Sequence, residues 1–334
     1  MTNPAVVEAT RGALVESAHR GAGAVVDADG RVVMAFGDAE RPVYPRSAVK
    51  ALQALPLVAS GAADSLSLSE KEIALACASH SGSEDHVATA RAMLAKAGYD
   101  ERALECGAHW PLGEDEARAL ARSGRTPTAL HNTCSGKHAG FVCLACAMGA
   151  DPKGYVAPGH PVQREVRASI EAMTDARLSE AMRGVDGCAI PTYAVPLAAL
   201  ARGFARLGTG HGLSAERRDA AARIRAAVAA HPLAVAGRGR FDTEVMSLLG
   251  PRVFIKSGAE GVCCAALPEA GLGLAVKADD GAGRAAQVMI AALIRRFGGF
   301  DDERTARFAS FVSPRLSNWN GAEVGHLRPA GPLA

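Results

Sequence analysis

Strand-like segments lie at both ends of this 334-residue chain, and helical segments fill its middle. Near the N-terminus, two apolar runs at 24–26 and 32–34 flank an Asp-Gly turn, which is a strong hairpin signal. Near the C-terminus, apolar segments at 252–256, 262–267 and 272–278 alternate with turns rich in glycine. Both ends of the chain are therefore predicted to contribute strands to one sheet.

Helices are predicted through the middle of the chain. One begins near Ser47, just after two prolines, and Ser67-Leu68-Ser69-Glu70 is typical of a capping box that opens another. Further stretches predict helices at 85–97, 114–123, 136–149, 161–175, 196–207, 215–230 and about 282–297.

The order of these elements indicates a mixed α/β chain of the α+β kind. We expect a single domain over residues 1–315, with an antiparallel sheet from about 10–45 and 250–300. A helical region at about 46–245 is inserted between the two halves of that sheet. The final segment, 316–334, is rich in Pro, Gly and Asn, and we expect it to be a surface tail.

Composition excludes several classes of protein. The chain has 22% charged and 49% hydrophobic residues, as soluble globular proteins do, and a net charge of only +2 gives no electrostatic case for nucleic acid or an anionic membrane. Its apolar stretches are shorter than the ~20 residues of a membrane span. The N-terminus lacks the pattern of a secretory signal, so the eight cysteines are expected to be reduced thiols in the cytoplasm. Nothing indicates an organic cofactor.

Ser47 and Lys50 form an S-x-x-K motif at a predicted helix start, in a chain with 7 lysines and 30 arginines. The three-residue spacing places both side chains on one helix face, and the helix N-terminus favours a developing negative charge. A neutral lysine can accept the proton of the serine hydroxyl. The motif therefore suits a serine–lysine nucleophile, although an N-cap serine beside a solvated lysine gives the same pattern.

A second motif, Lys256-Ser257-Gly258, follows a predicted strand. A K-[ST]-G motif after a strand accompanies S-x-x-K in penicillin-interacting serine enzymes. The two motifs in this order predict a serine-β-lactamase-like or glutaminase-like arrangement. The usual third motif, S-x-N, is absent in clean form, but the loop that contains Ser79 lies at about the right place to supply a hydroxyl.

The segment 131–138 places a thiol, an amide, an amine and two imidazoles in a loop that enters a helix. Its Ser-Gly pair allows backbone N–H groups to point at an anionic ligand. Cys134 and His138 are four positions apart, which could hold a metal from one helix face, and Cys188 could complete a mixed site with Cys134. The alternative is a capped helix with a buried cysteine.

With these residues assembled, the chain resembles the L-asparaginase II family. The resemblance implies hydrolysis of L-asparagine to L-aspartate and ammonia, on a serine-β-lactamase-like fold, usually as a homodimer. Six matching blocks occur in order: 45–50 with Gln53, 78–80, 131–138, 186–188, 239–243 and 256–261.

The resemblance also implies roles for individual residues. It implies two serine–lysine pairs, Ser47 with Lys50 and Ser79 with Lys256. In some members, positions that match Cys134, Lys137 and Cys188 hold a zinc ion.

We expect this zinc to shape the substrate pocket and not to activate water, because the serine–lysine groups already supply a nucleophile. The alternative is that both cysteines are simple reduced thiols.

Asparagine is a zwitterion, so its site needs a cation or an N–H cluster for the α-carboxylate and an anion for the α-ammonium. Arg46 and the Ser135-Gly136 backbone are candidates for the first, and Asp186 is the candidate for the second. Two further polar residues complete the predicted substrate contacts, Asn132 and His138.

Two other functions fit the same residues. One is another serine–lysine acyl hydrolase, either a glutaminase or a penicillin-interacting enzyme; the expected cytoplasmic location argues against a cell-wall substrate. The other is a non-catalytic module that binds zinc or an amino acid. The presence of Ser47, Lys50 and Lys256 argues against such a module.

Overall fold

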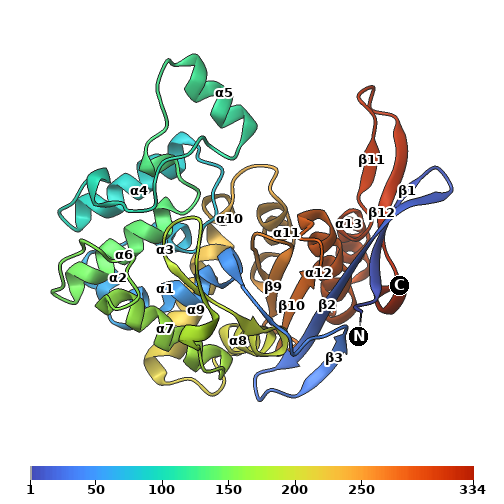
Figure 1. Cartoon of the computed structure of the whole chain (residues 1–334), viewed down its shortest axis with the longest axis horizontal. Helices are drawn as coiled ribbons and strands as arrows, with labels where there is room; N and C mark the ends of the chain where they lie inside the picture. The colour runs from blue at the N-terminus through green and yellow to red at the C-terminus, as the bar shows by residue number, and fades with distance from the viewer. Residues whose placement is uncertain (1) are drawn as a thin grey trace.

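The computed structural model describes residues 2–334, and one antiparallel sheet crosses it (Figure 1). The strand order is β11-β12-β1-β2-β10-β9-β8, with β3 paired to β2, so the N-terminal strands lie between two groups of C-terminal strands. The expected fold class is confirmed. The strands are β1 (Ala5–Arg11), β2 (Leu14–Asp27), β3 (Val32–Phe36), β8 (Phe254–Ser257), β9 (Val262–Leu267), β10 (Leu272–Ala278), β11 (Arg315–Ser317) and β12 (Glu323–Pro329).

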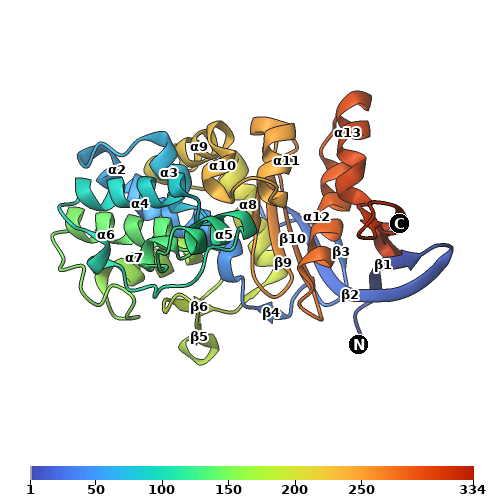
Figure 2. The same cartoon turned by 90° about the horizontal axis from the view of Figure 1, so that it is seen from above.

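Strands β2 and β10 join the two halves of the sheet, in a register that runs from Asp27 opposite Leu272 to Gly21 opposite Ala278. Helix α8 (Leu197–Thr209) packs on one face of this join, and α12 (Gly283–Phe297) packs on the other (Figure 2). Because both faces of this part of the sheet are covered, β9, most of β10 and the second half of β2 are buried on both sides and do not alternate between apolar and polar residues.

The remaining helices form a region on the far side of α8 (Figures 1 and 2). The seven helices predicted by residue range include α8 and α12, and all seven are confirmed to within two residues at each end. This region contains α1 (Lys50–Ala59), α2 (Ala62–Ser65), α3 (Glu70–Ala76), α4 (Glu84–Lys96), α5 (Glu114–Arg122), α6 (Ser135–Ala147), α7 (Pro161–Thr174), α9 (Ala215–Ala230) and α10 (Pro232–Val235), whereas α11 (Phe241–Leu249) packs on β8 and α13 (Asp302–Val312). In residues 2–334, no helix combines the length and the apolarity that a membrane crossing requires.

Helix α1 lies at the centre of the helical region, in contact with α6, α7 and α9. Residues 50–58 are all buried, because this helix is apolar on every side and must be surrounded. Its first residue, Lys50, is therefore drawn into the interior with the rest of the helix.

The expected capping box is displaced by two residues. Ser69, and not Ser67, caps α3. The Ser69 backbone N–H donates a hydrogen bond to the Glu72 carboxylate at 2.6 Å. Ser67 has φ +51°, so it lies in the preceding turn. Glu72 also forms an ion pair with Lys96 at 2.6 Å. This pair favours a helix start at Ser69, because that start places the Glu72 carboxylate beside Lys96.

The prediction that 316–334 is a surface tail is wrong. Strand β12 pairs with β1, with Val7 opposite Pro329 and Ala9 opposite Leu327, and the Leu327 side chain is buried. Of the residues that suggested a tail, Asn318 and Asn320 lie in the turn between β11 and β12, whereas Pro329 ends β12 and Pro332 follows it. Helix α13 (Asp302–Val312), which we did not predict, leads into this hairpin.

Candidate active site

Three of the seven lysines are buried where the sheet meets the helical region. Lys50, Lys137 and Lys256 are each exposed by 2% or less, and they come from α1, α6 and β8. A buried ammonium is unfavourable unless hydrogen bonds and opposite charges replace its water. Such a cluster of perturbed groups is typical of a functional site.

Lys50 follows a short 3-10 turn, Arg46–Val49, and its amine reaches across to the end of α3. Its Nζ lies 2.5 Å from the Ala78 carbonyl oxygen, 2.9 Å from Ser79 Oγ and 3.2 Å from Cys134 Sγ. Burial lowers the pKa of Lys50 to about 8, and although a charge on Cys134 opposes this shift, the other two lysines add to it. Lys50 is thus poised to exchange a proton near neutral pH.

The serine–lysine contacts differ from the pairs that the resemblance implied. Lys50 contacts Ser79, while Lys256 contacts the Ser257 carbonyl oxygen at 2.8 Å and Asp242 at 3.4 Å. In residues 2–334, neither Ser47 with Lys50 nor Ser79 with Lys256 forms a side-chain hydrogen bond. The Lys50 side chain extends toward the Ala78 carbonyl oxygen. Its amine therefore lies next to Ser79 and not next to Ser47.

Ser47 nevertheless lies beside the K-S-G motif. A Cβ atom at Gly258 would be 2.7 Å from the Pro45 carbonyl oxygen and 3.0 Å from the Ala48 nitrogen, so only glycine permits this approach. Ser47 is half-buried, and its hydroxyl has no hydrogen-bond partner among residues 2–334. The preceding residue, Arg46, has φ +51°, a backbone strain that is typical of functional sites.

Cys134 and Cys188 meet beside Lys137, so the proximity that the sequence suggested is confirmed. Lys137 donates to Cys188 Sγ at 3.1 Å. A hydrogen bond from Cys188 holds the pKa of Cys134 well below its usual value, and although burial opposes this, the charges of Lys50 and Lys137 support it. Burial alone would lower the pKa of Lys137, but the sulfur charges raise it. The group therefore behaves as a thiolate paired with an ammonium.

The chemistry of these donors fits a zinc ion. Two sulfurs and one amine converge, and zinc prefers sulfur and nitrogen ligands in tetrahedral sites. Lys137 must lose its proton to act as a ligand. Across residues 2–334, no three His, Cys, Asp or Glu side chains cluster in a way that could hold a metal, so the lysine is needed as the third donor.

Arg46 and Asp186 form an ion pair at the edge of this cluster. Arg46 Nη2 lies 3.0 Å from Asp186 Oδ1, and the two side chains are 27% and 14% exposed. Burial alone would raise the pKa of Asp186, but the charges of Lys137 and Arg46 lower it, so Asp186 stays a carboxylate. The edge of the site thus presents a cation and an anion side by side.

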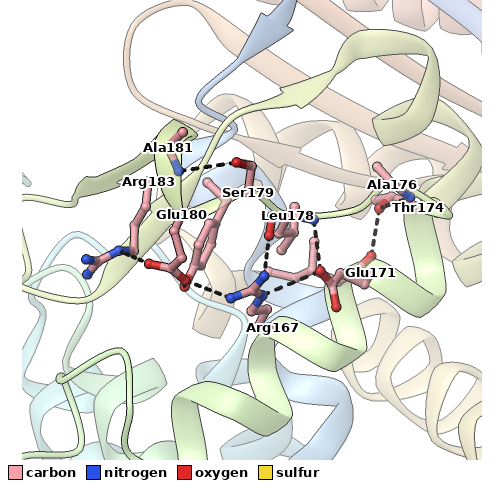
Figure 3. Close-up of polar contacts among 11 residues, drawn as sticks. Arg167, Glu171, Thr174, Ala176, Leu178, Ser179, Glu180, Ala181 and Arg183 are labelled. Carbon is pink, nitrogen blue, oxygen red and sulfur yellow. Dashed lines mark hydrogen bonds and ion pairs between the residues drawn. The ribbon is translucent and has the colours of Figure 1, made fainter.

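The segment that leads to Asp186 is held by Arg167 on α7 (Figure 3). Arg167 lies 2.7 Å from Glu180 and 3.4 Å from Glu171, and it also donates to the Leu178 carbonyl oxygen. Glu171 accepts the Leu178 backbone N–H at 2.8 Å. The planar guanidinium of Arg167 binds two carboxylates and one backbone carbonyl at once. These contacts hold residues 178–180, which lead into the hairpin of β5 (Arg183–Val185) and β6 (Pro191–Tyr193).

Asn132 and Gly136 shape the loop that enters α6. Both amide hydrogens of Asn132 go to the backbone carbonyls of 106–107, and its oxygen accepts the Cys134 N–H at 2.8 Å. A Cβ atom on Gly136 would lie 2.4 Å from the Leu75 carbonyl oxygen, so glycine lets α6 pack closely on α3. Direct substrate contact by either residue stays a prediction.

Ser135 belongs to a buried chain of hydrogen bonds. The Gly82 N–H donates to His80 Nδ1 at 3.1 Å, so the proton of this ring is on Nε2, which donates to Ser135 Oγ at 2.9 Å. Ser135 in turn donates to the Leu130 carbonyl oxygen. Burial holds the pKa of His80 well below its usual value, so the ring is neutral.

His138 is oriented by Tyr155. The Tyr155 hydroxyl accepts the Glu105 N–H at 2.8 Å and lies 2.6 Å from His138 Nδ1, so its own hydrogen points to that nitrogen. His138 Nε2 is then a donor, and it is buried with no partner among residues 2–334. Among residues 2–334, His138 and Cys134 belong to no group of three His, Cys, Asp or Glu side chains that could hold a metal, so the structure does not support the expected pair.

Sequence reasoning assigned no role to Asp242, a buried carboxylate in the first turn of α11. It lies 3.4 Å from Lys256 Nζ and 2.9 Å from the Ser257 backbone nitrogen. Its position inside the matched block 239–243 was the only signal, and nothing in the spacing linked that block to β8.

Comparison with known proteins assigns the family. The family model described as L-asparaginase II matches residues 7–329. No curated protein matches the sequence.

Two solved structures are similar to the chain at low identity. One is a β-lactamase from Mycobacterium bovis, with 16% identity, a TM-score of 0.38, and coverage of 86% of this chain and 94% of that one. The other is Mglu in its tris and glutamate form, with 17% identity, a TM-score of 0.38, and coverage of 90% of this chain and 65% of that one. Because the family match spans nearly the whole chain, including all three buried lysines, this protein belongs to the L-asparaginase II family and is an amidohydrolase of that family.

Proposed function

We propose that this protein hydrolyses L-asparagine to L-aspartate and ammonia with a serine–lysine nucleophile. The observation that carries the proposal is the buried Lys50 amine, which has a pKa of about 8 and lies 2.9 Å from the Ser79 hydroxyl. An amide carbonyl needs a nucleophile, a proton carrier and a charged pocket, and this cluster offers all three.

The ion pair at the edge of the site supports a zwitterionic amino acid as the substrate. Arg46 can take the α-carboxylate, and Asp186, which stays ionised, can take the α-ammonium. A bound zwitterion would replace the Arg46–Asp186 ion pair by two ion pairs with the substrate, so both half-buried charges would stay matched. The unpartnered His138 Nε2 is a further donor for substrate oxygen.

In the proposed reaction, Ser47 Oγ attacks the side-chain amide carbon while its proton passes to neutral Lys50. The Ser79 hydroxyl, already bonded to Lys50, then delivers a proton to the leaving nitrogen as the C–N bond breaks. Water hydrolyses the acyl-serine by the same groups in reverse. Ser47 is assigned the attack because it belongs to the S-x-x-K motif and its hydroxyl is free, although it shares no hydrogen bond with Lys50 among residues 2–334. Ser79, which does contact Lys50 at 2.9 Å, is the alternative nucleophile that the serine variants test.

The experiment that tests the function is ammonia release from asparagine and glutamine, assayed beside hydrolysis of a chromogenic β-lactam. Asparagine should be the preferred substrate, and one extra methylene should reduce kcat/KM for glutamine by about 10- to 200-fold. Preference for glutamine or the β-lactam would favour the other acyl hydrolases, and no turnover of any of the three would favour a binding module.

Serine variants should separate attack from proton transfer. Ser47→Ala is expected to lower kcat by at least about 1000-fold and to form no acyl-enzyme, because a covalent nucleophile is lost. Ser79→Ala should lower kcat by about 100- to 10,000-fold, as loss of a proton carrier does, yet still leave an adduct on Ser47. Mass spectrometry of acid-quenched enzyme locates the adduct, with Ser60→Ala on the surface as the control. An adduct on Ser79 would exchange the two roles.

The pH profile should report Lys50. Because only the neutral amine accepts a proton and the pKa of Lys50 is about 8, kcat/KM should rise about tenfold per pH unit up to that value and then level off. Lys50→Arg should be inactive because arginine stays protonated, while Lys71→Arg on the surface should match the wild type. An ascending limb centred below about pH 6 would indicate a carboxylate or histidine base instead.

We also propose that Cys134, Lys137 and Cys188 hold zinc, which would shape the wall of the substrate pocket and leave the attack to the serine–lysine groups. A chelator should then raise KM or lower the melting temperature more than it lowers kcat, and elemental analysis should find about one zinc per chain. A metal-free, fully active enzyme that zinc does not change would contradict the site. Complete loss of kcat with unchanged folding, reversed by zinc, would make the metal catalytic and remove the serines from that role.

Two further expectations belong to the proposal. The homodimer implied by the family resemblance stays a prediction, and so does the cytoplasmic location. Neither the fold nor the site geometry depends on them.

A further inference from the structure

We propose that Asp242 is a positioning residue for Lys256, holding the end of β8 and supplying the negative charge that lets this lysine stay buried in the K-S-G segment that packs on the turn of Ser47. The inference rests on the proposed function. It concerns a carboxylate on α11, an element that contributes no residue to the expected catalytic set.

The contacts of Asp242 account for both of its oxygens. Oδ2 accepts the Ser257 N–H at 2.9 Å and lies 3.4 Å from Lys256 Nζ, and Oδ1 accepts the Ser257 hydroxyl. Asp242 is 4% exposed and Lys256 is 1% exposed, so water does not replace either partner. Among residues 2–334, Asp242 is the only carboxylate that pairs with Lys256.

The carboxylate also controls where β8 ends. Asp242 binds the backbone and the side chain of Ser257, and Gly258 follows directly and packs on the turn that carries Ser47. A shift of this strand end would therefore press on the Pro45 carbonyl and the Ser47 turn. Asp242 thus links α11 directly to Lys256 and, through Ser257 and Gly258, to the turn that carries Ser47.

A charge role and a packing role can be told apart, because the chain contains a matched pair elsewhere. Glu72 is also 4% exposed and pairs with Lys96 at 2.6 Å, far from the K-S-G motif in the sequence and in the helical region. Both Asp242→Asn and Glu72→Gln keep the shape of a buried carboxylate and remove its charge. Asp242→Asn should lower the melting temperature more than Glu72→Gln, because Lys256 is 1% exposed and loses its anion without gaining water, whereas the Lys96 side chain is 34% exposed.

The test is a double-mutant cycle of Asp242→Asn and Lys256→Met, measured on kcat/KM for asparagine and on the melting temperature. Asp242→Asn should reduce kcat/KM by about 100-fold, the scale of losing one preorganised charge at the reacting centre, while Glu72→Gln should leave it within about threefold. If Asp242 acts through Lys256, the double variant should be no less active than Lys256→Met alone. It should also be more stable than Asp242→Asn, because no unpaired charge is left.

Other outcomes overturn the proposal. Additive losses in the double variant, or an Asp242→Asn enzyme with wild-type kcat/KM, would show that Asp242 does not act through Lys256. Ser257→Ala removes one bond to Asp242 but keeps both charges, so it should change kcat/KM by less than about threefold. A loss as large as that of Asp242→Asn would overturn the charge role and leave only the hold on β8. A wild-type enzyme that does not hydrolyse asparagine would instead overturn the proposed function, and the stability arm of the cycle would still test the Asp242–Lys256 pair.

Discussion

The burial of three lysines is the constraint that the rest of this site satisfies. Each amine needs an acceptor once water is gone, and the chain supplies a different kind to each: a backbone carbonyl and a hydroxyl for Lys50, sulfur for Lys137 and a carboxylate for Lys256. These acceptors come from α3, the loop before α6, the β5–β6 hairpin and α11. The elements around the site are therefore tied together by the need to pair these charges.

Counting charges also explains why Lys50 is the amine that gives up its proton. Lys137 faces the Cys134 thiolate and Lys256 faces Asp242, so two ammonium groups have nearby anions. Lys50 shares the same thiolate with Lys137 and otherwise contacts only neutral oxygens. Burial lowers the pKa of Lys50, whereas the sulfur charges raise that of Lys137, so Lys50 reaches its neutral form more easily than Lys137, and this makes it suitable as a base.

Features set by local sequence could be predicted well. Helix bounds and the hairpins follow from periodicity and turn residues, and the motifs around Ser47, Cys134 and Lys256 marked the segments that do converge. The partners within the site could not be predicted, because contacts such as Lys50 with Ser79 or Lys256 with Asp242 depend on how side chains extend between distant segments. The strand at 323–329 was missed for a similar reason: its partner β1 lies at the opposite end of the chain, and its own composition is that of a loop.

The pairing of β1 with β12 has a consequence for how the protein is made. Thr10 and His326 share a hydrogen bond across 316 positions, so the first strand to leave the ribosome waits for almost the last one. Until then, one edge of β1 presents unpaired backbone groups, which can template pairing with other chains. Closing so long a loop also slows folding. Completion of the sheet thus waits until residues 323–329 have been made, and a nascent chain that stalls before residue 323 carries an open edge into the cell.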